Sequence, residues 1–166
     1  MAEPNAARKR YLPQRWRQWL LTTHIILSVG LLGDSAGFLA VAIRAASATD
    51  PQQVRELMRV LDMFSIVFGI PLSVGAIVTG VALGLGSKWG VFSYPWVTTK
   101  LLLNVSVMVV GALVIGPALK ATIDGTGDGT QQLVAAAAYD VAALILATGL
   151  SVFKPGRAFP ARALQS

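Results

Sequence analysis

Five ionisable side chains lie within or beside the long apolar stretches of this chain: His24, Asp34, Asp62, Lys100 and Asp140. A carboxyl group in apolar surroundings has to be protonated, paired or hydrated, because an isolated charge is costly there. Two carboxyl groups that share such a site can act as acid and base on a bound molecule. Asp34 and Asp140 are therefore a candidate catalytic pair.

The two carboxyl groups are expected at nearly the same depth. At about 1.5 Å per helical residue, Asp34 lies roughly 14 Å from Arg44 and Asp140 roughly 12 Å from Gln132. Hydroxyl groups that can complete a polar pocket belong to Ser28, Ser35 and Tyr139. A structural hydrogen bond between two helices is the alternative to a functional pocket.

A second polar group is expected near the opposite interface. His24 and Lys100 each follow a tryptophan by little more than one helical turn, and Asn104 lies one turn beyond Lys100 on the same face. Together they predict a site for an anion or a lipid headgroup. The alternatives are a lysine that extends to the interface and a histidine bonded to a carbonyl group, Thr98 or Thr99. The candidate ligand-binding residues are His24, Ser35, Lys100, Asn104 and Tyr139.

No metal and no cofactor are expected. The chain has no cysteine and one histidine, which excludes thiolate metal sites and haem held between two histidines of one chain. The segment Asp124–Gly129 resembles the start of a calcium-binding loop, but its twelfth position is Ala135, where such a loop requires glutamate. A turn in which Thr130 caps the next helix is the better interpretation.

Four apolar stretches have to position these residues. They are Leu20–Ile43, Met63–Leu85, Val97–Leu119 and Leu133–Phe153. Each is long enough to cross a bilayer as a helix, which takes about 20 residues. The predicted fold is all-α, a four-helix transmembrane bundle, in a multi-pass protein of a bacterial cytoplasmic membrane. Helices are expected at 19–45, 51–86, 95–120 and 130–153, in a transmembrane domain (19–154) between a basic N-terminal segment (1–18) and a C-terminal tail (155–166).

Basic residues predict that both termini are cytoplasmic, because positive charges beside a span stay on that side. Arg8, Lys9, Arg10, Arg15 and Arg17 precede the first span, and Lys154, Arg157 and Arg162 follow the fourth. Their position beside the spans also explains the net charge of +6 without nucleic-acid binding.

The second predicted helix carries several signals of local structure. Asp50 followed by Pro51 is typical of a helix start, with a capping carboxylate and a proline in the first turn. Pro71 stands inside an apolar run, removes a backbone donor and predicts a bend at Gly69–Pro71. Small residues four apart, such as Gly80 and Gly84, predict close helix contacts within or between chains.

Several motifs occur in the first three predicted helices. They are Leu21-Thr22-Thr23-His24, Ser28–Gly33, Phe38-Leu39-Ala40, Thr79-Gly80, Gly86–Gly90, Tyr94–Val97 and Lys100-Leu101. These segments resemble a family of small bacterial four-helix membrane proteins of unknown function, which is distantly similar to copper-resistance D-type membrane domains. The resemblance implies a four-helix unit with a histidine early in the first helix and no established activity. Members usually have a small apolar residue where this chain has Asp34, which weakens any analogy with copper or haem transfer.

Three kinds of function fit these residues. The leading prediction is a non-catalytic membrane subunit or a binding protein for a small lipophilic molecule, surrounded by membrane lipids and assembled as a homo-oligomer or within a membrane complex. One alternative is a membrane-embedded isomerase or cyclase that uses Asp34 and Asp140 as acid and base. The other is a proton-coupled transporter or channel. An apolar cavity containing both carboxyl groups would favour the enzyme.

Overall fold

The computed structural model describes residues 13–86 and 95–153, and every regular element in these ranges is helical. The elements are α1 (Gln14–Ala46), α2 (Pro51–Phe64), the π-helical turn η1 (Ser65–Gly69), α3 (Ile70–Leu85), α4 (Pro95–Val110), the π-helical turn η2 (Gly111–Ile115), α5 (Gly116–Ile123) and α6 (Thr130–Phe153). They join into four rods that are long and apolar enough to cross a membrane. The predicted all-α bundle with four spans is confirmed.

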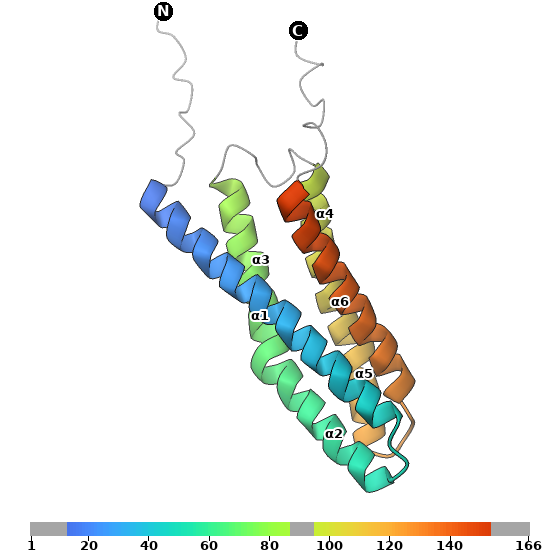
Figure 1. The fold of residues 1–166 in the computed structure, drawn as a ribbon. Coiled ribbons are helices and arrows are strands. Elements are labelled where there is room, and N and C mark those ends of the chain that lie inside the picture. Colours follow the sequence, from blue (N-terminus) through green and yellow to red (C-terminus); the bar gives the residue numbers. More distant parts are fainter. Residues whose placement is uncertain (1–12, 87–94, 154–166) are drawn as a thin grey trace, which may run out of the picture.

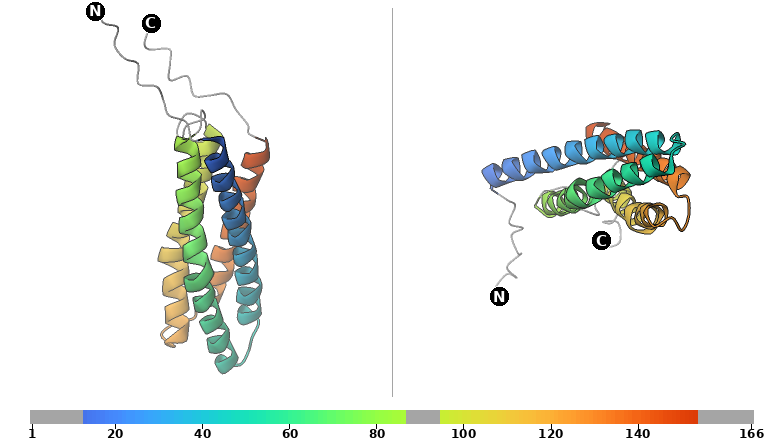
Figure 2. Two further views of the ribbon diagram at one scale, coloured as in Figure 1. Left: turned by 90° about the vertical axis from the view of Figure 1, so that its left-hand side faces the viewer. Right: turned by 90° about the horizontal axis from the view of Figure 1, so that it is seen from below.

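Neighbouring rods run in alternating directions, so α1 begins and α6 ends at the same end of the bundle (Figures 1 and 2). The side of the membrane that this end faces remains a prediction. α1 begins at Gln14 rather than at residue 19. Pro13, directly before it, does not have helical backbone geometry. The third rod continues to Ile123, and Gly125 beyond it has the left-handed backbone that commonly ends helices.

The start of α2 has the predicted cap. The Oδ1 atom of Asp50 accepts a hydrogen bond of 2.9 Å from the Gln52 backbone N–H, and Pro51 is the first helical residue. α6 starts differently, because Asp128 rather than Thr130 supplies the acceptor. Its Oδ1 atom accepts bonds from the backbone N–H and the hydroxyl of Thr130, at 2.9 and 2.7 Å. These two bonds stabilise the ionised form and hold the pKa of Asp128 below its usual value.

A π-helical turn stands directly before a proline in both middle rods. At η1 the Ile70 N–H bonds to the carbonyl oxygen of Ser65, five residues earlier, and Pro71 has no N–H to offer. The Ile66 carbonyl therefore lacks both donors that an α- or π-helix would supply. η2 repeats this arrangement before Pro117. The interrupted backbone hydrogen bonding at Pro71 is thus present as a π-turn, and the predicted bend itself stays a prediction.

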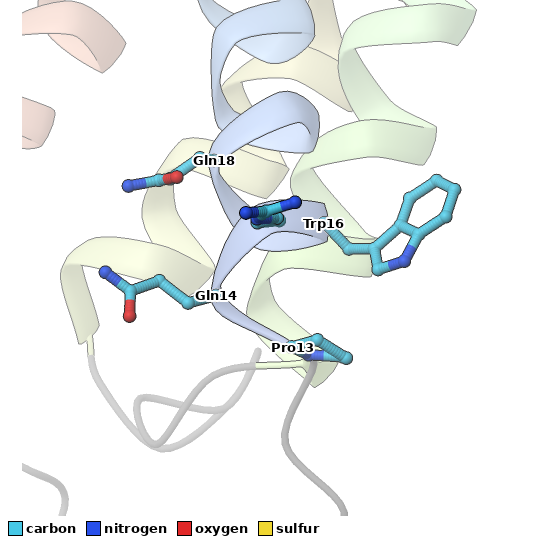
Figure 3. A pocket seen from close by; sticks show the side chains of 5 residues that line it. Pro13, Gln14, Trp16 and Gln18 are labelled. Carbon is cyan, nitrogen blue, oxygen red and sulfur yellow. The ribbon is translucent and has the colours of Figure 1, made fainter.

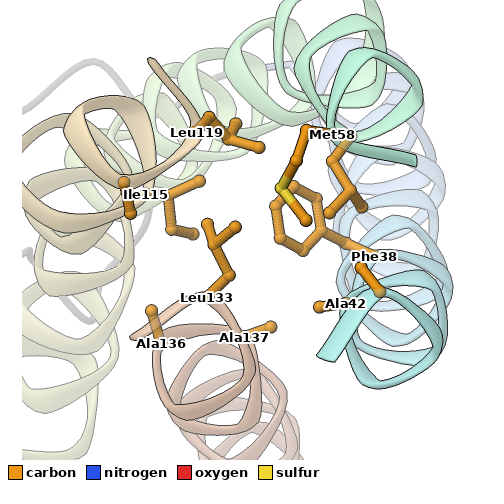
Figure 4. Packing of buried hydrophobic residues seen from close by; sticks show 11 residues of the cluster. Phe38, Ala42, Met58, Ile115, Leu119, Leu133, Ala136 and Ala137 are labelled. Carbon is orange, nitrogen blue, oxygen red and sulfur yellow. The ribbon is translucent and has the colours of Figure 1, made fainter. Parts of the chain in front are cut away.

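The rods pack tightly at the end where α1 finishes. Phe38 of α1, Met58 of α2, Leu119 of α5 and Leu133 of α6 meet there in one buried cluster (Figure 4). A smaller second cluster lies further along and consists of Leu31, Val107, Ala143 and Leu144. The buried residues of α1 are Leu31, Ser35, Phe38, Ala42 and Ala45, all in its second half. The first half of α1 therefore contributes no buried residue to the bundle.

Candidate functional site

A cavity of about 530 Å³ lies between α1, α3, α4 and α6, in the half of the bundle where α1 begins. It occupies the space that the first half of α1 leaves open, because α1 and α6 diverge toward this end (Figure 1). Its floor includes Leu31 and Leu144 of the second buried cluster. Pockets for small molecules commonly measure about 300–1,000 Å³. The cavity is large enough for a ligand of that class.

One side of the cavity is open to the surroundings of the bundle. Leu21, Ile25 and Val29 line it at successive turns of α1 and are 43%, 52% and 64% exposed. In a transmembrane helix, exposed apolar residues of this kind meet lipid chains. This side of the cavity wall is therefore formed in part by residues that would face lipid.

The predicted group of His24, Lys100 and Asn104 lies together in this cavity. Arg17 lines its outer part, and hydroxyl groups of Ser28, Thr148 and Ser151 add further polar lining. Ser28 was expected beside the carboxyl groups and instead lies on the cavity wall one turn beyond His24. That a ligand binds these residues remains a prediction.

Thr79 of α3 holds the imidazole of His24, rather than Thr98 or Thr99 of α4. The Nδ1 atom of His24 lies 2.9 Å from the Thr79 hydroxyl oxygen. That hydroxyl lies 2.6 Å from the Gly75 carbonyl oxygen, to which it donates. Gly80 permits the close approach, since a Cβ atom there would lie 3.1 Å from Cε1 of His24. The Thr79-Gly80 pair was the available signal in the sequence, but its partner could not be read from it.

Lys100 lies beside an aromatic ring at the end of the bundle. Its Nζ atom is 5.9 Å from the ring centroid of Trp96, a distance at which a cation is attracted to the ring face. Trp96 precedes Lys100 by one turn, so the ammonium group is directed toward the start of α4. This agrees with the expected extension toward the interface, and it leaves the charge at the cavity wall.

Asn104 has an unsatisfied polar atom in the same region. Its Oδ1 atom is buried and has no hydrogen-bond partner among residues 13–86 and 95–153. Buried acceptors without a donor are rare in proteins, and each needs an explanation. A bound molecule with a donor group is one such explanation.

Asp34 lies against the π-turn of the second rod. Its Oδ2 atom is 3.5 Å from the position that a Cβ atom on Gly69 would occupy, and its buried Oδ1 atom has no hydrogen-bond partner among the described residues. Glycine at this position leaves room for the carboxyl group beside the backbone of η1. Asp34 therefore contacts the segment where backbone hydrogen bonding is already disrupted.

Asp140 is buried between the two apolar clusters. It is 6% exposed, and its Oδ1 atom has no hydrogen-bond partner in the part of the chain that the structure describes. On α6 it stands between Ala137 of the larger cluster and Ala143 of the smaller one, and on α1 Ser35 occupies the corresponding interval between Leu31 and Phe38. Asp34 directly precedes Ser35. The carboxyl groups of Asp34 and Asp140 therefore stand at a similar level of the bundle, as their predicted depths indicate.

The carboxyl groups and the cavity are separate features. Asp34 and Asp140 each stand about one turn beyond the floor residues Leu31 and Leu144, and neither lines the cavity. Tyr139 is directed elsewhere, since its hydroxyl lies 2.7 Å from that of Ser106 on α4. The structure thus assembles His24, Lys100 and Asn104 around one space and does not place the acidic pair there.

Replacing Asp140 with alanine is expected to stabilise the protein. No described residue bonds to Oδ1 of the carboxyl group, so its removal relieves an unmet hydrogen-bonding requirement of about 1–3 kcal/mol. Alanine also matches Ala136, Ala137 and Ala143 on the same buried face. Denaturant unfolding in mixed micelles should show a higher midpoint for Asp140→Ala. A lower midpoint would show that the native carboxyl group has a stabilising partner.

A second depression lies at the first turn of α1 (Figure 3). Pro13, Gln14, Arg15, Trp16 and Gln18 line it, all from one short segment. The Trp16 ring extends from one side of the helix and Gln14 and Gln18 from the other. Side chains of a single helical turn do not enclose a ligand. Exposed Trp16 and Trp19 instead match the preference of indole rings for a membrane interface.

Comparison with known proteins identifies the class of the chain. A family model described as a predicted integral membrane protein, DUF2269, matches residues 18–155. This range includes the four apolar rods except the first turn of α1. Neither a curated protein nor a solved structure matches the chain. The further likeness to copper-resistance D-type domains remains a prediction.

Proposed function

This chain belongs to the DUF2269 family of integral membrane proteins, and we propose that it binds a negatively charged lipophilic small molecule in the cavity between its four spans. The observation that carries the proposal is the composition of the cavity wall. Arg17 and Lys100 supply positive charge, and none of the described lining residues is aspartate or glutamate. Most of the remaining lining is aliphatic.

The position of the charges supports an amphiphilic ligand. Arg17 lies at the outer end of the cavity, the Lys100 ammonium group is directed toward the same end beside Trp96, and the floor includes leucine side chains. An anionic headgroup would pair with the cations, while an aliphatic chain would fill the apolar part. Charge-assisted hydrogen bonds are about twice as strong as neutral ones, so the headgroup would fix the orientation of the ligand.

A binding function fits the site better than catalysis does. The carboxyl groups that would act as acid and base lie beyond the cavity floor, so a molecule in the cavity would not be positioned between them. His24 and the cationic groups can hold a ligand by charge and hydrogen bonds. The proposed role is therefore non-catalytic, and it deepens the leading interpretation of the sequence.

Replacing Lys100 with methionine is expected to weaken binding of oleate about tenfold or more, because a hydrogen bond to a charged group contributes about 1.5–3 kcal/mol. The protein would be reconstituted in phosphatidylcholine nanodiscs, and oleate would be titrated against a fluorescent fatty acid. Oleyl alcohol, which has the chain without the charge, should bind more weakly than oleate.

The matched control is Lys120→Met, which removes an exposed lysine from α5 at the other end of the bundle. This variant should retain the affinity of the parent protein for oleate. Equal affinities of the parent and Lys100→Met, or a failure of the parent to bind oleate and the other anionic amphiphiles described below, would contradict the proposal.

A further inference from the structure

The neutral polar groups of the cavity wall mostly offer acceptors to a ligand. The Thr148 hydroxyl donates to the Leu144 carbonyl oxygen at 2.8 Å, and the Ser151 hydroxyl donates to that of Ala147 at 2.9 Å. A hydroxyl group has one hydrogen, so each oxygen keeps only lone pairs for other partners. Thr148 and Ser151 can therefore accept a hydrogen bond from a bound molecule while their own hydrogens stay on α6.

The contacts of His24 indicate that it too offers an acceptor to a ligand. The hydrogen of the Thr79 hydroxyl is directed to the Gly75 carbonyl at 2.6 Å, and the Ala76 carbonyl is a second acceptor at 3.3 Å. The contact between Thr79 and Nδ1 of His24 is consequently a donation from the Nδ1–H. In the neutral imidazole this tautomer leaves Nε2 without a hydrogen, as an acceptor. The ring of His24 also donates to the Ala76 carbonyl oxygen, which in this tautomer is again a donation from the Nδ1–H, and His24 lines the cavity.

We infer that the ligand carries hydroxyl donors next to its negative charge, as a phosphoglycerol or sugar-phosphate headgroup on an alkyl chain does. This inference rests on the proposed binding of an anionic amphiphile. The cations take the negative charge, and the lone pairs of His24, Thr148 and Ser151 take the hydroxyl hydrogens. The buried Oδ1 atom of Asn104, which has no partner among the described residues, adds a fourth acceptor in the same cavity.

Thr79 has a positioning role in this scheme. It does not line the cavity and acts on the ligand only through the orientation and tautomer of His24. A carboxylate or phosphate without hydroxyl groups would leave the acceptors unpaired. An amphiphile with hydroxyl donors would pair them, and burial away from water makes that difference count in affinity.

Two ligands that differ only in their donors test this inference. Dodecylphosphoglycerol carries one negative charge and two hydroxyl groups, and its dimethyl ether has the same charge and chain without the donors. In phosphatidylcholine nanodiscs, the parent protein is expected to bind the hydroxyl form about three- to tenfold more tightly, which corresponds to one hydrogen bond. Displacement of a fluorescent fatty acid gives both affinities.

Variants then assign the preference to His24. His24→Phe keeps a ring and removes one acceptor, so the preference for the hydroxyl form should fall while the affinity for the dimethyl ether is retained. Thr79→Val has nearly the same shape as threonine and releases the tautomer, so it should reduce the preference in the same direction. A preference that is unchanged in Thr79→Val would overturn the role of the Thr79 contact.

The outcomes separate this inference from the proposed function. If both ligands bind the parent protein equally well, the requirement for hydroxyl donors is wrong and the binding of anionic amphiphiles stands. If neither ligand binds and oleate does not bind, the proposed function fails as well. Glycerol phosphate, which has no alkyl chain, should not compete; competition at equal strength would show that the site takes a soluble anion.

Discussion

Replacing Ser28 with phenylalanine is expected to lower the affinity for oleate at least about 30-fold, or roughly 2 kcal/mol. Ser28 lines the cavity on α1, one turn beyond His24, and is only partly buried. A phenylalanine side chain there would fill space that the aliphatic part of the ligand is proposed to occupy. The new ring would contact apolar residues, so the fold should be retained. Displacement of a fluorescent fatty acid in nanodiscs measures the loss.

Ile26→Phe is the matched control for this substitution. Ile26 is 65% exposed, does not line the cavity, and lies two residues from Ser28, almost on the opposite face of α1. It receives the same aromatic ring in contact with lipid, and binding should remain as in the parent protein. If Ser28→Phe binds oleate as tightly as Ile26→Phe does, the ligand does not occupy the cavity.

Replacing Gly129 with alanine is expected to destabilise the protein by about 1–3 kcal/mol, the usual cost of overpacking. An added Cβ atom would lie 2.7 Å from the carbonyl oxygen of Ala118 and 2.8 Å from its Cβ atom. Both belong to α5, whose backbone cannot move away without disturbing Leu119 in the larger cluster. The Gly129 N–H also bonds to the Thr122 hydroxyl at 2.9 Å. Denaturant unfolding in mixed micelles should show a lower midpoint.

Gly127→Ala provides the comparison in the same connection. A Cβ atom at Gly127 would lie 3.8 Å from that of Ala121, which is ordinary van der Waals contact. The loss of backbone freedom in the unfolded chain makes this substitution neutral or slightly stabilising. A similar loss of stability in both variants would show that alanine in this connection is unfavourable for a reason other than the contact with Ala118.

The four spans could be predicted because their cause is local. A helix in lipid satisfies its own backbone hydrogen bonds, so a run of about 20 apolar residues specifies a span without reference to its neighbours. The cap at Asp50 and the disruption before Pro71 are equally local, since each depends on residues within one turn. At the start of α6 the sequence offers two possible acceptors, Asp128 and Thr130, and the carboxylate of Asp128 is the one that accepts.

The depth of each candidate residue in the membrane could be predicted from the sequence. The direction in which its side chain points could not be predicted as well. Counting residues from the interface placed His24 at the depth of Lys100 and Asp34 at the depth of Asp140, because helical rise depends on residue number alone. The rotation of each helix, and therefore the wall on which a side chain lies, depends on packing between spans. Thr79 as the partner of His24 and Ser28 as part of the cavity wall could not be derived from separation along the chain.

The sequence by itself determined that this is an integral membrane protein with four spans, and it identified the few polar residues inside them. Only the tertiary structure decided that the first half of α1 leaves a cavity, and that His24, Lys100 and Asn104 line it while Asp34 and Asp140 do not. The physical reason is that span formation depends on the hydrocarbon thickness and on hydrogen bonds within one helix. A cavity depends instead on how helix surfaces from distant parts of the chain fit together.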